Sequence, residues 1–199
     1  MTTRGRPAVF VDRDGTLNRE VAYLRRIADL RLLPGAAAGV RRLSSAGFAV
    51  VVVSNQSGVA RGLIRPETLR AIHAEMTRRL AAKDARLAGI YVCPHHPGIG
   101  AAPLRRRCGC RKPAPGLIRR AARELALDLR RSYCVGDGPG DLGMARAVGI
   151  PAVLVLTGHG RRTRRALSSE HAATHVAVNF RAAVDWIIHD ARQATRRRR

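Results

Sequence analysis

Residues 8–16 read Ala-Val-Phe-Val-Asp-Arg-Asp-Gly-Thr, an apolar run that leads directly into two carboxylates and a glycine. The run from Ala8 to Val11 predicts a buried strand. Asp12 stands where that strand ends and Asp14 follows in the turn. Both carboxylates can reach one crevice if the strand belongs to a parallel sheet, because ligands of open α/β sheets bind at this edge. A solvated turn is the alternative, since Asp and Gly are common turn residues.

Strand and helix patterns alternate along the rest of the chain. Further strands are predicted over residues 48–53, 89–92, 132–135, 151–156 and 176–178, and helices over 34–46, 66–83, 115–127, 141–148 and 181–190. This order predicts an α/β fold, Rossmann-like and doubly wound, with a mostly parallel sheet and helices on both faces. The segments after Asp14 and around the cysteines are too short for a large cap domain.

A length of 199 residues fits one domain, which we expect over residues 1–190, with the zinc loop described below at 93–110 and a basic, disordered tail at 191–199. No run approaches the roughly 18–20 apolar residues of a membrane span, and the amino end lacks a secretory signal. We therefore expect a cytoplasmic monomer with no membrane partner, and membrane transport is excluded as a function class.

The formal net charge is +23, which invites a nucleic-acid interpretation. Aromatic residues make up only 4% of the chain, so base-stacking platforms would be sparse. The basic residues are almost all arginine and are spread over most predicted helices. We expect no specific nucleic-acid partner, and a non-catalytic polyanion-binding protein remains an alternative.

Polar residues follow three of the predicted strands. They are Asp12 and Asp14, the run Ser54-Asn55-Gln56-Ser57-Gly58, and Asp137 within Gly136-Asp137-Gly138. Arg111 and Lys112 add two cations at the start of a helix. In a parallel sheet these groups gather at one edge, where they suit a phosphate. Each has a plainer interpretation: Ser54, Asp137 and Asp141 as capping or turn residues, and Lys112 as a surface lysine.

The segment between residues 93 and 112 is long, irregular and rich in Cys, His, Pro and Gly. Cys93, His95, Cys108 and Cys110 supply three thiols and an imidazole, enough for a closed tetrahedral zinc site. A reducing cytoplasm disfavours a disulfide. His96 is not expected to be a ligand, and Cys134 is expected to be a small buried hydrophobe.

The ordered motifs DRDGT, SNQSG, CRKP and VGD resemble the haloacid dehalogenase superfamily of phosphatases. The signatures NQSGVARG, CPHHP and CGCRKPAPG resemble its D-glycero-D-manno-heptose 1,7-bisphosphate 7-phosphatase branch, which is closely related to histidinol-phosphatases. The resemblance runs from about Val9 to about Leu156.

This resemblance implies a catalytic assignment. Asp12 would be the nucleophile that forms an aspartyl-phosphate, and Asp14 the general acid and base. Asp12, the main-chain carbonyl of Asp14, and Asp137 would hold Mg²⁺. Ser54, the Asn55 amide and Lys112 would hold the phosphoryl group during transfer.

Substrate contacts are implied in the same way, at Glu20, Tyr23, Ser54, Asn55, Gln56, Ser57, Arg111 and Lys112. Arg111 would recognise the second phosphate end of the substrate. The implied zinc ligands are Cys93, His95, Cys108 and Cys110, with a structural role that places Arg111 and Lys112 over the site. Residues 20–23 are less polar than the family pattern, so the sugar identity stays open.

The expected function is that of a Mg²⁺-dependent phosphatase that acts on a small phosphorylated sugar. It would remove the 7-phosphate of D-glycero-D-manno-heptose 1,7-bisphosphate and leave heptose 1-phosphate for nucleotide-activated heptose synthesis. Histidinol phosphate or another small sugar phosphate is the alternative substrate, and a phosphorylated nucleic-acid end is a third.

Overall fold

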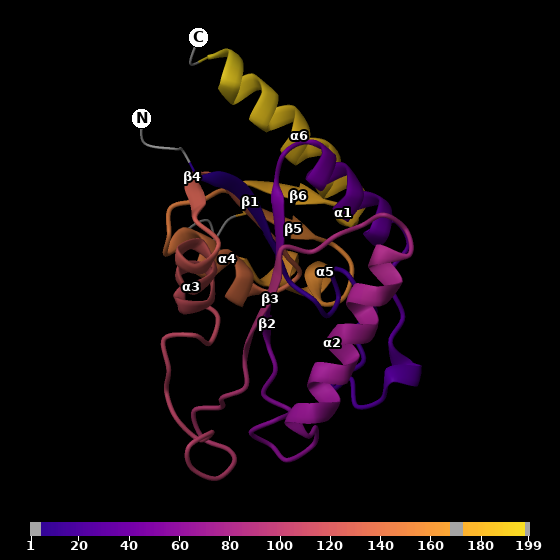
Figure 1. The fold of residues 1–199 in the computed structure, drawn as a ribbon. Coiled ribbons are helices and arrows are strands. Elements are labelled where there is room, and N and C mark those ends of the chain that lie inside the picture. The colour runs from indigo at the N-terminus through magenta and orange to yellow at the C-terminus, as the bar shows by residue number, and fades with distance from the viewer. Residues whose placement is uncertain (1–4, 168–172, 198–199) are drawn as a thin grey trace.

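The structure, a computed structural model, describes residues 5–167 and 173–197. Six parallel strands form one sheet in the order β3-β2-β1-β4-β5-β6 (Figure 1). The strands are β1 (Arg6–Val11), β2 (Ala49–Asn55), β3 (Gly89–Cys93), β4 (Leu127–Gly136), β5 (Ala152–Val155) and β6 (His175–Ala177). This is the predicted doubly wound α/β fold.

Helices cover both faces of the sheet (Figure 1). They are α1 (Ala36–Ser45), α2 (Pro66–Ala81), α3 (Gly116–Glu124), α4 (Pro139–Arg146), α5 (Gly160–Ala166) and α6 (Phe180–Arg196), with a short 3-10 turn η1 (Ile27–Asp29). α1 and α6 pack together on one face, joined by the buried side of α2, while α3 and α4 cover the other face.

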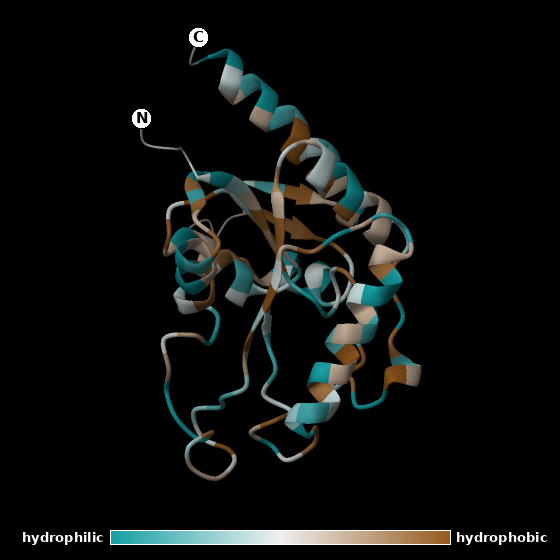
Figure 2. Ribbon diagram, in the orientation of Figure 1, coloured by the Kyte–Doolittle hydropathy of each residue, from teal (hydrophilic) through white to brown (hydrophobic). Residues whose placement is uncertain are grey.

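The central strand β2 is buried from both sides, which explains its continuous apolar sequence. In β2, Val50 and Val52 pack toward α1 and α6, whereas Val51 and Val53 pack toward α3 and α4. This division follows from the two-residue repeat of a strand, which sends successive side chains to opposite faces. Figure 2 shows the apolar strands at the centre and the polar surfaces of the helices outside them.

The strand order places β1 between β2 and β4, so the winding reverses direction beside β1. A crevice opens at such a reversal, beyond the carboxyl ends of the strands, because the neighbouring connections leave in opposite directions. Asp12 directly follows β1, Ser54 is the next-to-last residue of β2, and Asp137 directly follows β4. The topology therefore brings the three predicted groups together.

Towards the carboxyl end of the chain, one prediction needs correction and one helix was not predicted. α6 continues to Arg196, so the disordered tail expected from residue 191 is wrong through residue 196. Ala and Arg are good helix formers, and they dominate this segment. Residues 198 and 199 lie outside the described part of the chain, as do residues 1–4 and 168–172. Helix α5 has no counterpart among the predicted elements.

The connections add no second sheet within the described residues. The segment between β1 and α1 contains only η1 and isolated bridges such as that between Asn18 and Leu32. The segment between β3 and α3 lies beside the turn after β2, where the Ala60 amide donates to the Pro94 carbonyl (Figure 1). Among the described helices, none has the length and apolar character to cross a membrane.

Candidate active site

A cavity of about 350 Å³ opens at the carboxyl ends of β1, β2 and β4. It is lined by every residue that the sequence analysis placed at the phosphate site, namely Asp12, Asp14, Glu20, Tyr23, Ser54, Asn55, Gln56, Ser57, Arg111, Lys112 and Asp137. These residues come from the ends of three strands and from two loops. The fold thus assembles the predicted set in one place.

Lys112 is buried and bridges two carboxylates. Its Nζ lies 2.6 Å from Asp12 Oδ1 and 2.7 Å from Asp141 Oδ1, and it also donates to the Val53 carbonyl. Burial alone would lower the pKa of Lys112, but Asp12 and Asp141 outweigh it and raise the pKa. The ammonium is therefore a permanent positive charge inside the cavity, and Lys112 is not the surface lysine of the alternative interpretation.

Asp12, Asp137 and Asp141 form a buried group whose carboxylate oxygens lie within 4.8 Å of one another. Burial raises the pKa of Asp12 to about 8; Lys112 opposes this increase, whereas Asp141 and Asp137 add to it. Burial also raises the pKa of Asp137 to about 6. When all three carboxyl groups are ionised, the single ammonium leaves two negative charges uncompensated, which suits a divalent cation with oxygen ligands.

Two glycines make room beside Asp137. A side chain on Gly15, whose φ is +77°, or on Gly158 would collide with the Asp137 carboxylate. The His159 amide donates to Asp137 Oδ2 at 2.7 Å, and Thr163 Oγ1 donates to its carbonyl. The start of α5 therefore orients Asp137. The carboxylate ligands of Asp12, Asp137 and Asp141, together with the close packing around Asp137, fit magnesium.

Asp14 is held apart from that group. Arg13 donates from Nε and Nη2 to both carboxylate oxygens of Asp14, with a closest contact of 2.7 Å. Asn18 and Gln56 donate to the same carboxylate. Burial would raise the pKa of Asp14, but Arg13 and these hydrogen bonds lower it overall. The two motif aspartates thus have pKa values shifted in opposite directions.

The residues that follow β2 organise the floor of the cavity. Ser54 Oγ accepts a hydrogen bond from Gln56 Nε2 at 2.8 Å, so its own hydroxyl proton remains available to a ligand. No helix begins until Pro66, which rules out Ser54 as a helix cap. The Asn55 side chain binds both the main-chain amide and the carbonyl of Lys112. Asn55 therefore fixes the loop that carries the lysine.

Asp141 makes the capping contact that its sequence position suggested, and it also contacts Lys112. Its Oδ2 accepts from the Gly138 amide at the start of α4, which is a capping contact. Its Oδ1 receives the Lys112 ammonium. Asp141 also belongs to the metal-capable group with Asp12 and Asp137.

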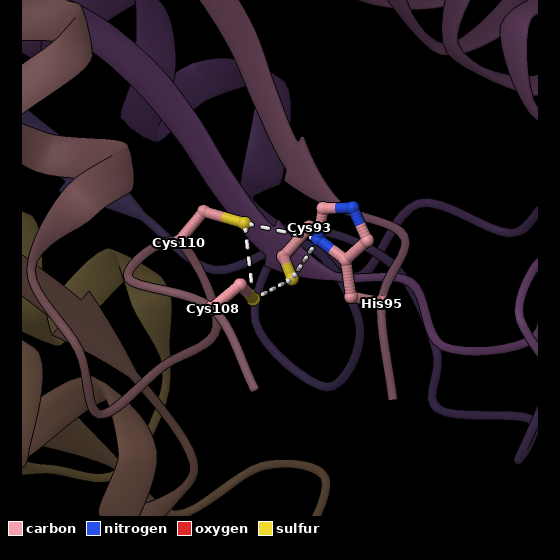
Figure 3. A group of neighbouring side chains, drawn as sticks. All are labelled: Cys93, His95, Cys108 and Cys110. Atoms are coloured by element: carbon pink, nitrogen blue, oxygen red, sulfur yellow. Dashed lines mark hydrogen bonds between the residues drawn. The ribbon is translucent and has the colours of Figure 1, made fainter. Parts of the chain in front are cut away.

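The cysteine segment folds into a four-residue cluster (Figure 3). Cys93 Sγ lies 3.5 Å from Cys108 Sγ, Cys108 and Cys110 Sγ lie 3.3 Å apart, and His95 Nδ1 lies 3.3 Å from Cys110 Sγ. Zinc–ligand bonds of about 2.0–2.3 Å in a tetrahedron require donors about 3.3–3.8 Å apart. The cluster can therefore hold zinc in a closed site.

The predictions for His96 and Cys134 are confirmed. His96 is not among the four residues of the cluster, and its Nε2 contacts Arg61. Cys134 is buried within β4.

The cluster and the cavity are joined by a short stretch of chain. Arg111 and Lys112 directly follow Cys110, and Arg111 Nη1 donates to the His95 carbonyl at 3.3 Å. Anchoring of the cysteine loop therefore also anchors the two cations that line the cavity.

Sequence reasoning missed several residues that shape the cavity. Arg13 lines it and binds Asp14, and His73 of α2 contacts Arg13. His159 lines it and binds Asp137. A charged residue between two aspartates at a strand end was a usable signal for Arg13. His73 and His159 had no local signal, because their partners are distant in the sequence.

A parallel α/β sheet with two carboxylates after β1, a serine at the end of β2, a buried lysine and a carboxylate after β4 defines a haloacid dehalogenase-like hydrolase. The HAD-hydrolase-like family model matches residues 109–183.

The curated relatives narrow the family. The D-glycero-β-D-manno-heptose-1,7-bisphosphate 7-phosphatase of Yersinia pestis is 38% identical over 94% of this chain and 92% of its own length. The D-glycero-D-manno-heptose-1,7-bisphosphate 7-phosphatase of Thermosynechococcus vestitus is 42% identical over 92% of this chain and 95% of its own length. This chain belongs to the heptose-bisphosphate 7-phosphatase family and is therefore a phosphoric monoester hydrolase.

The solved structures agree with this placement. The crystal structure of D,D-heptose 1,7-bisphosphate phosphatase from B. bronchiseptica, complexed with magnesium and phosphate, superposes with a TM-score of 0.81. It is 36% identical and covers 92% of this chain and 99% of its own. That relative was crystallised with magnesium and phosphate. In this chain, the three carboxylates would suit the magnesium, and Arg111 and Lys112 would suit the phosphate.

Proposed function

We propose that this chain removes the 7-phosphate of D-glycero-D-manno-heptose 1,7-bisphosphate and releases heptose 1-phosphate, the form required for nucleotide activation of the sugar. The observation that carries this proposal is the contact of buried Lys112 with Asp12, next to Asp137, in a cavity that Arg111 also lines. Relatives that match nearly the whole chain carry the same activity in their names.

In the first half of the reaction, a carboxylate oxygen of Asp12 attacks the phosphorus atom. The bond from phosphorus to the sugar oxygen breaks, and Asp14 gives that oxygen a proton. Asp12 then carries the phosphoryl group. Lys112 would neutralise charge on the phosphoryl oxygens and the Ser54 hydroxyl would donate a hydrogen bond to one of them; both line the cavity, and such electrostatic stabilisation is the main task of a protein in phosphoryl transfer.

In the second half, a water molecule attacks the phosphorus atom of the aspartyl-phosphate. Asp14 takes a proton from this water, the bond from phosphorus to Asp12 breaks, and inorganic phosphate leaves. The lowered pKa of Asp14 keeps its carboxylate ionised and therefore free to take this proton, which it then gives to the next leaving group.

Asp12, Asp137 and the main-chain carbonyl of Asp14 would hold Mg²⁺, with Asp141 close by. When bound, the cation lets an anionic nucleophile approach an anionic phosphate and stabilises the charge of the transferred group. Zinc in the cluster formed by Cys93, His95, Cys108 and Cys110 would hold the loop that presents Arg111 and Lys112.

The far end of the substrate would meet Arg111, which can clamp the second phosphate with two parallel hydrogen bonds. Glu20 and Tyr23 line the same cavity from the loop after β1 and would contact the sugar. Gln56 and Ser57 complete this wall, although Gln56 is also bound to Asp14 and Ser54.

We also infer that residues 1–190 act as one catalytic domain and that the chain works as a cytoplasmic monomer. Among the described residues a single sheet is present. The four cysteines are unpaired, which fits a reducing compartment. Size measurement of the purified chain by light scattering tests the monomer.

The test of the proposed function is a comparison of kcat/KM on heptose 1,7-bisphosphate and on histidinol phosphate, with the product identified by ³¹P NMR. We expect a preference of at least about tenfold for the bisphosphate, with the 1-phosphate retained. Equal or higher kcat/KM on histidinol phosphate, or loss of the 1-phosphate, contradicts the proposal.

A further inference from the structure

Arg13 is a buried cation that the proposed reaction does not use. It stands between the two motif aspartates and is only 1% exposed. Its Nε and Nη2 each lie within 3.1 Å of both oxygens of Asp14, and Nη2 also donates to Gln56 Oε1. A guanidinium presents its donors in a rigid fork, so these contacts define the orientation of the Asp14 carboxylate.

His73 holds Arg13 from behind. Arg13 Nη1 lies 3.0 Å from His73 Nε2, and the two residues are 60 positions apart. A guanidinium has donors and no acceptor, so Nε2 of His73 accepts this hydrogen bond and carries no proton. Helix α2 thereby fixes the third nitrogen of a side chain whose other two face Asp14.

Both oxygens of Asp14 are surrounded by donors. Asn18 Nδ2 donates to Oδ1 at 2.9 Å, and Gln56 Nε2 donates to Oδ2 at 2.9 Å. These neighbours therefore hold the ionised carboxylate of Asp14 in one orientation. Such alignment matters because a small displacement of an acid–base group can cost a large factor in rate.

We propose that Arg13 is a positioning residue for Asp14 and that His73 keeps Arg13 in place for this task. The inference rests on the proposed function, in which Asp14 takes a proton from water as the bond from phosphorus to Asp12 breaks. Without the guanidinium fork, only Asn18 and Gln56 hold the Asp14 carboxylate, so it is aligned with the attacking water less often. Hydrolysis of the aspartyl-phosphate is the step that slows.

The test uses p-nitrophenyl phosphate and the magnesium-loaded enzyme. Nitrophenolate leaves without a proton, so the first turnover does not need Asp14, whereas every later turnover does. The variant Arg13→Lys keeps the charge and loses the fork. We expect its steady-state kcat to fall about 10- to 100-fold and KM to fall with it, so that kcat/KM and the first-turnover rate stay within about threefold of wild type.

The ratio of first-turnover to steady-state rate therefore rises in Arg13→Lys, and a burst of nitrophenolate approaches one per active site. A purely structural role would reduce both rates together, in proportion to the loss of competent enzyme. Equal losses in the two rates, or no loss in either, overturn the proposal. Asp12→Asn is the blank and gives no burst.

A matched pair at His73 covers the case in which Arg13→Lys does not fold. His73→Gln keeps an acceptor for Arg13, and His73→Leu removes it. We expect His73→Gln to retain most of the wild-type kcat and His73→Leu to show the same rise in rate ratio as Arg13→Lys. Indistinguishable kcat values and rate ratios for Gln and Leu at this position would overturn the role of His73.

The result of the Arg13 test does not depend on which sugar phosphate is the natural substrate. A wild-type enzyme that hydrolyses p-nitrophenyl phosphate but ignores heptose 1,7-bisphosphate contradicts the proposed substrate and leaves the Arg13 test intact. A correct substrate with unchanged rate ratios in the variants contradicts only the positioning role.

Discussion

Lys112 Nζ lies 2.6 Å from Asp12 Oδ1, although the two residues are 100 positions apart in the chain. The lysine reaches Asp12 from the loop before α3, across the end of β2, and its main chain is held by Asn55. The contact closes the cavity on one side. It also gives the proposed nucleophile a fixed positive neighbour, which a phosphoryl group would share.

Replacement of Lys112 should be severe. Its ammonium is a compact charge with three buried oxygen partners, Asp12, Asp141 and the Val53 carbonyl, which a planar guanidinium does not match. We expect Lys112→Arg to lower kcat/KM by about 10²-fold or more. Lys83→Arg is the matched control, because Lys83 is exposed and is the other lysine of the chain. Equal activity of the two variants would refute this assignment.

Asp12→Asn should abolish phosphate release. The amide keeps the shape of the side chain but cannot form the phosphoryl bond, so we expect a loss of at least about 10³-fold. The circular dichroism spectrum and cooperative unfolding should stay like those of wild type. Near wild-type turnover would remove Asp12 as the nucleophile.

Magnesium should stabilise the fold more at pH 8 than at pH 5. The folded-state pKa values of Asp12, about 8, and Asp137, about 6, lie above 3.8, so protons compete with the cation as the pH falls. A concentration 100 times the Kd adds about 2.7 kcal/mol, or about 5–10 °C in Tm. Asp137→Asn should lose most of this gain in a thermal unfolding scan, and a gain of equal size in the variant would speak against the site.

His73 should make the protein less stable as the pH falls from 6.5 to 4. Burial, with help from Arg13, lowers its pKa to about 4, below the 6.5 of an exposed histidine. The unfolded chain takes up a proton in this window and the folded chain does not, so the free energy of unfolding decreases. The decrease is at most about 3 kcal/mol. Urea unfolding of wild type and of His73→Gln at several pH values measures this decrease. If the free energy of unfolding depends on pH equally in the two proteins across this window, the effect is excluded.

Zinc should be found at about one ion per chain. Cys108→Ser removes one of four donors, so we expect the zinc content to fall well below one and activity to fall with it, because Arg111 and Lys112 lose their anchored loop. Cys134→Ala is the matched control, since this thiol is buried in β4 away from the cluster. Mass spectrometry of the purified, metal-supplemented proteins measures the content. Folded wild type without zinc would defeat the assignment.

The main elements followed from local patterns. The run Val50 to Val53 is apolar without interruption because both faces of β2 are covered, and that pattern is visible in the sequence. Helix α5 was missed because Arg161, Arg162, Arg164 and Arg165 leave it almost no apolar repeat. It forms because the chain returns beside Asp137, where the His159 amide and Thr163 hydroxyl find partners.

The sequence by itself determined the strand ends, the carboxylates at them, the cysteine set and the family, because these depend on residue type and order. Only the tertiary structure decided which buried cation pairs with which of the carboxylates. Lys112 forms ion pairs with Asp12 and Asp141, while Arg13 forms an ion pair with Asp14. Such pairings depend on distances between segments far apart in the chain and on burial from water, neither of which a local pattern contains.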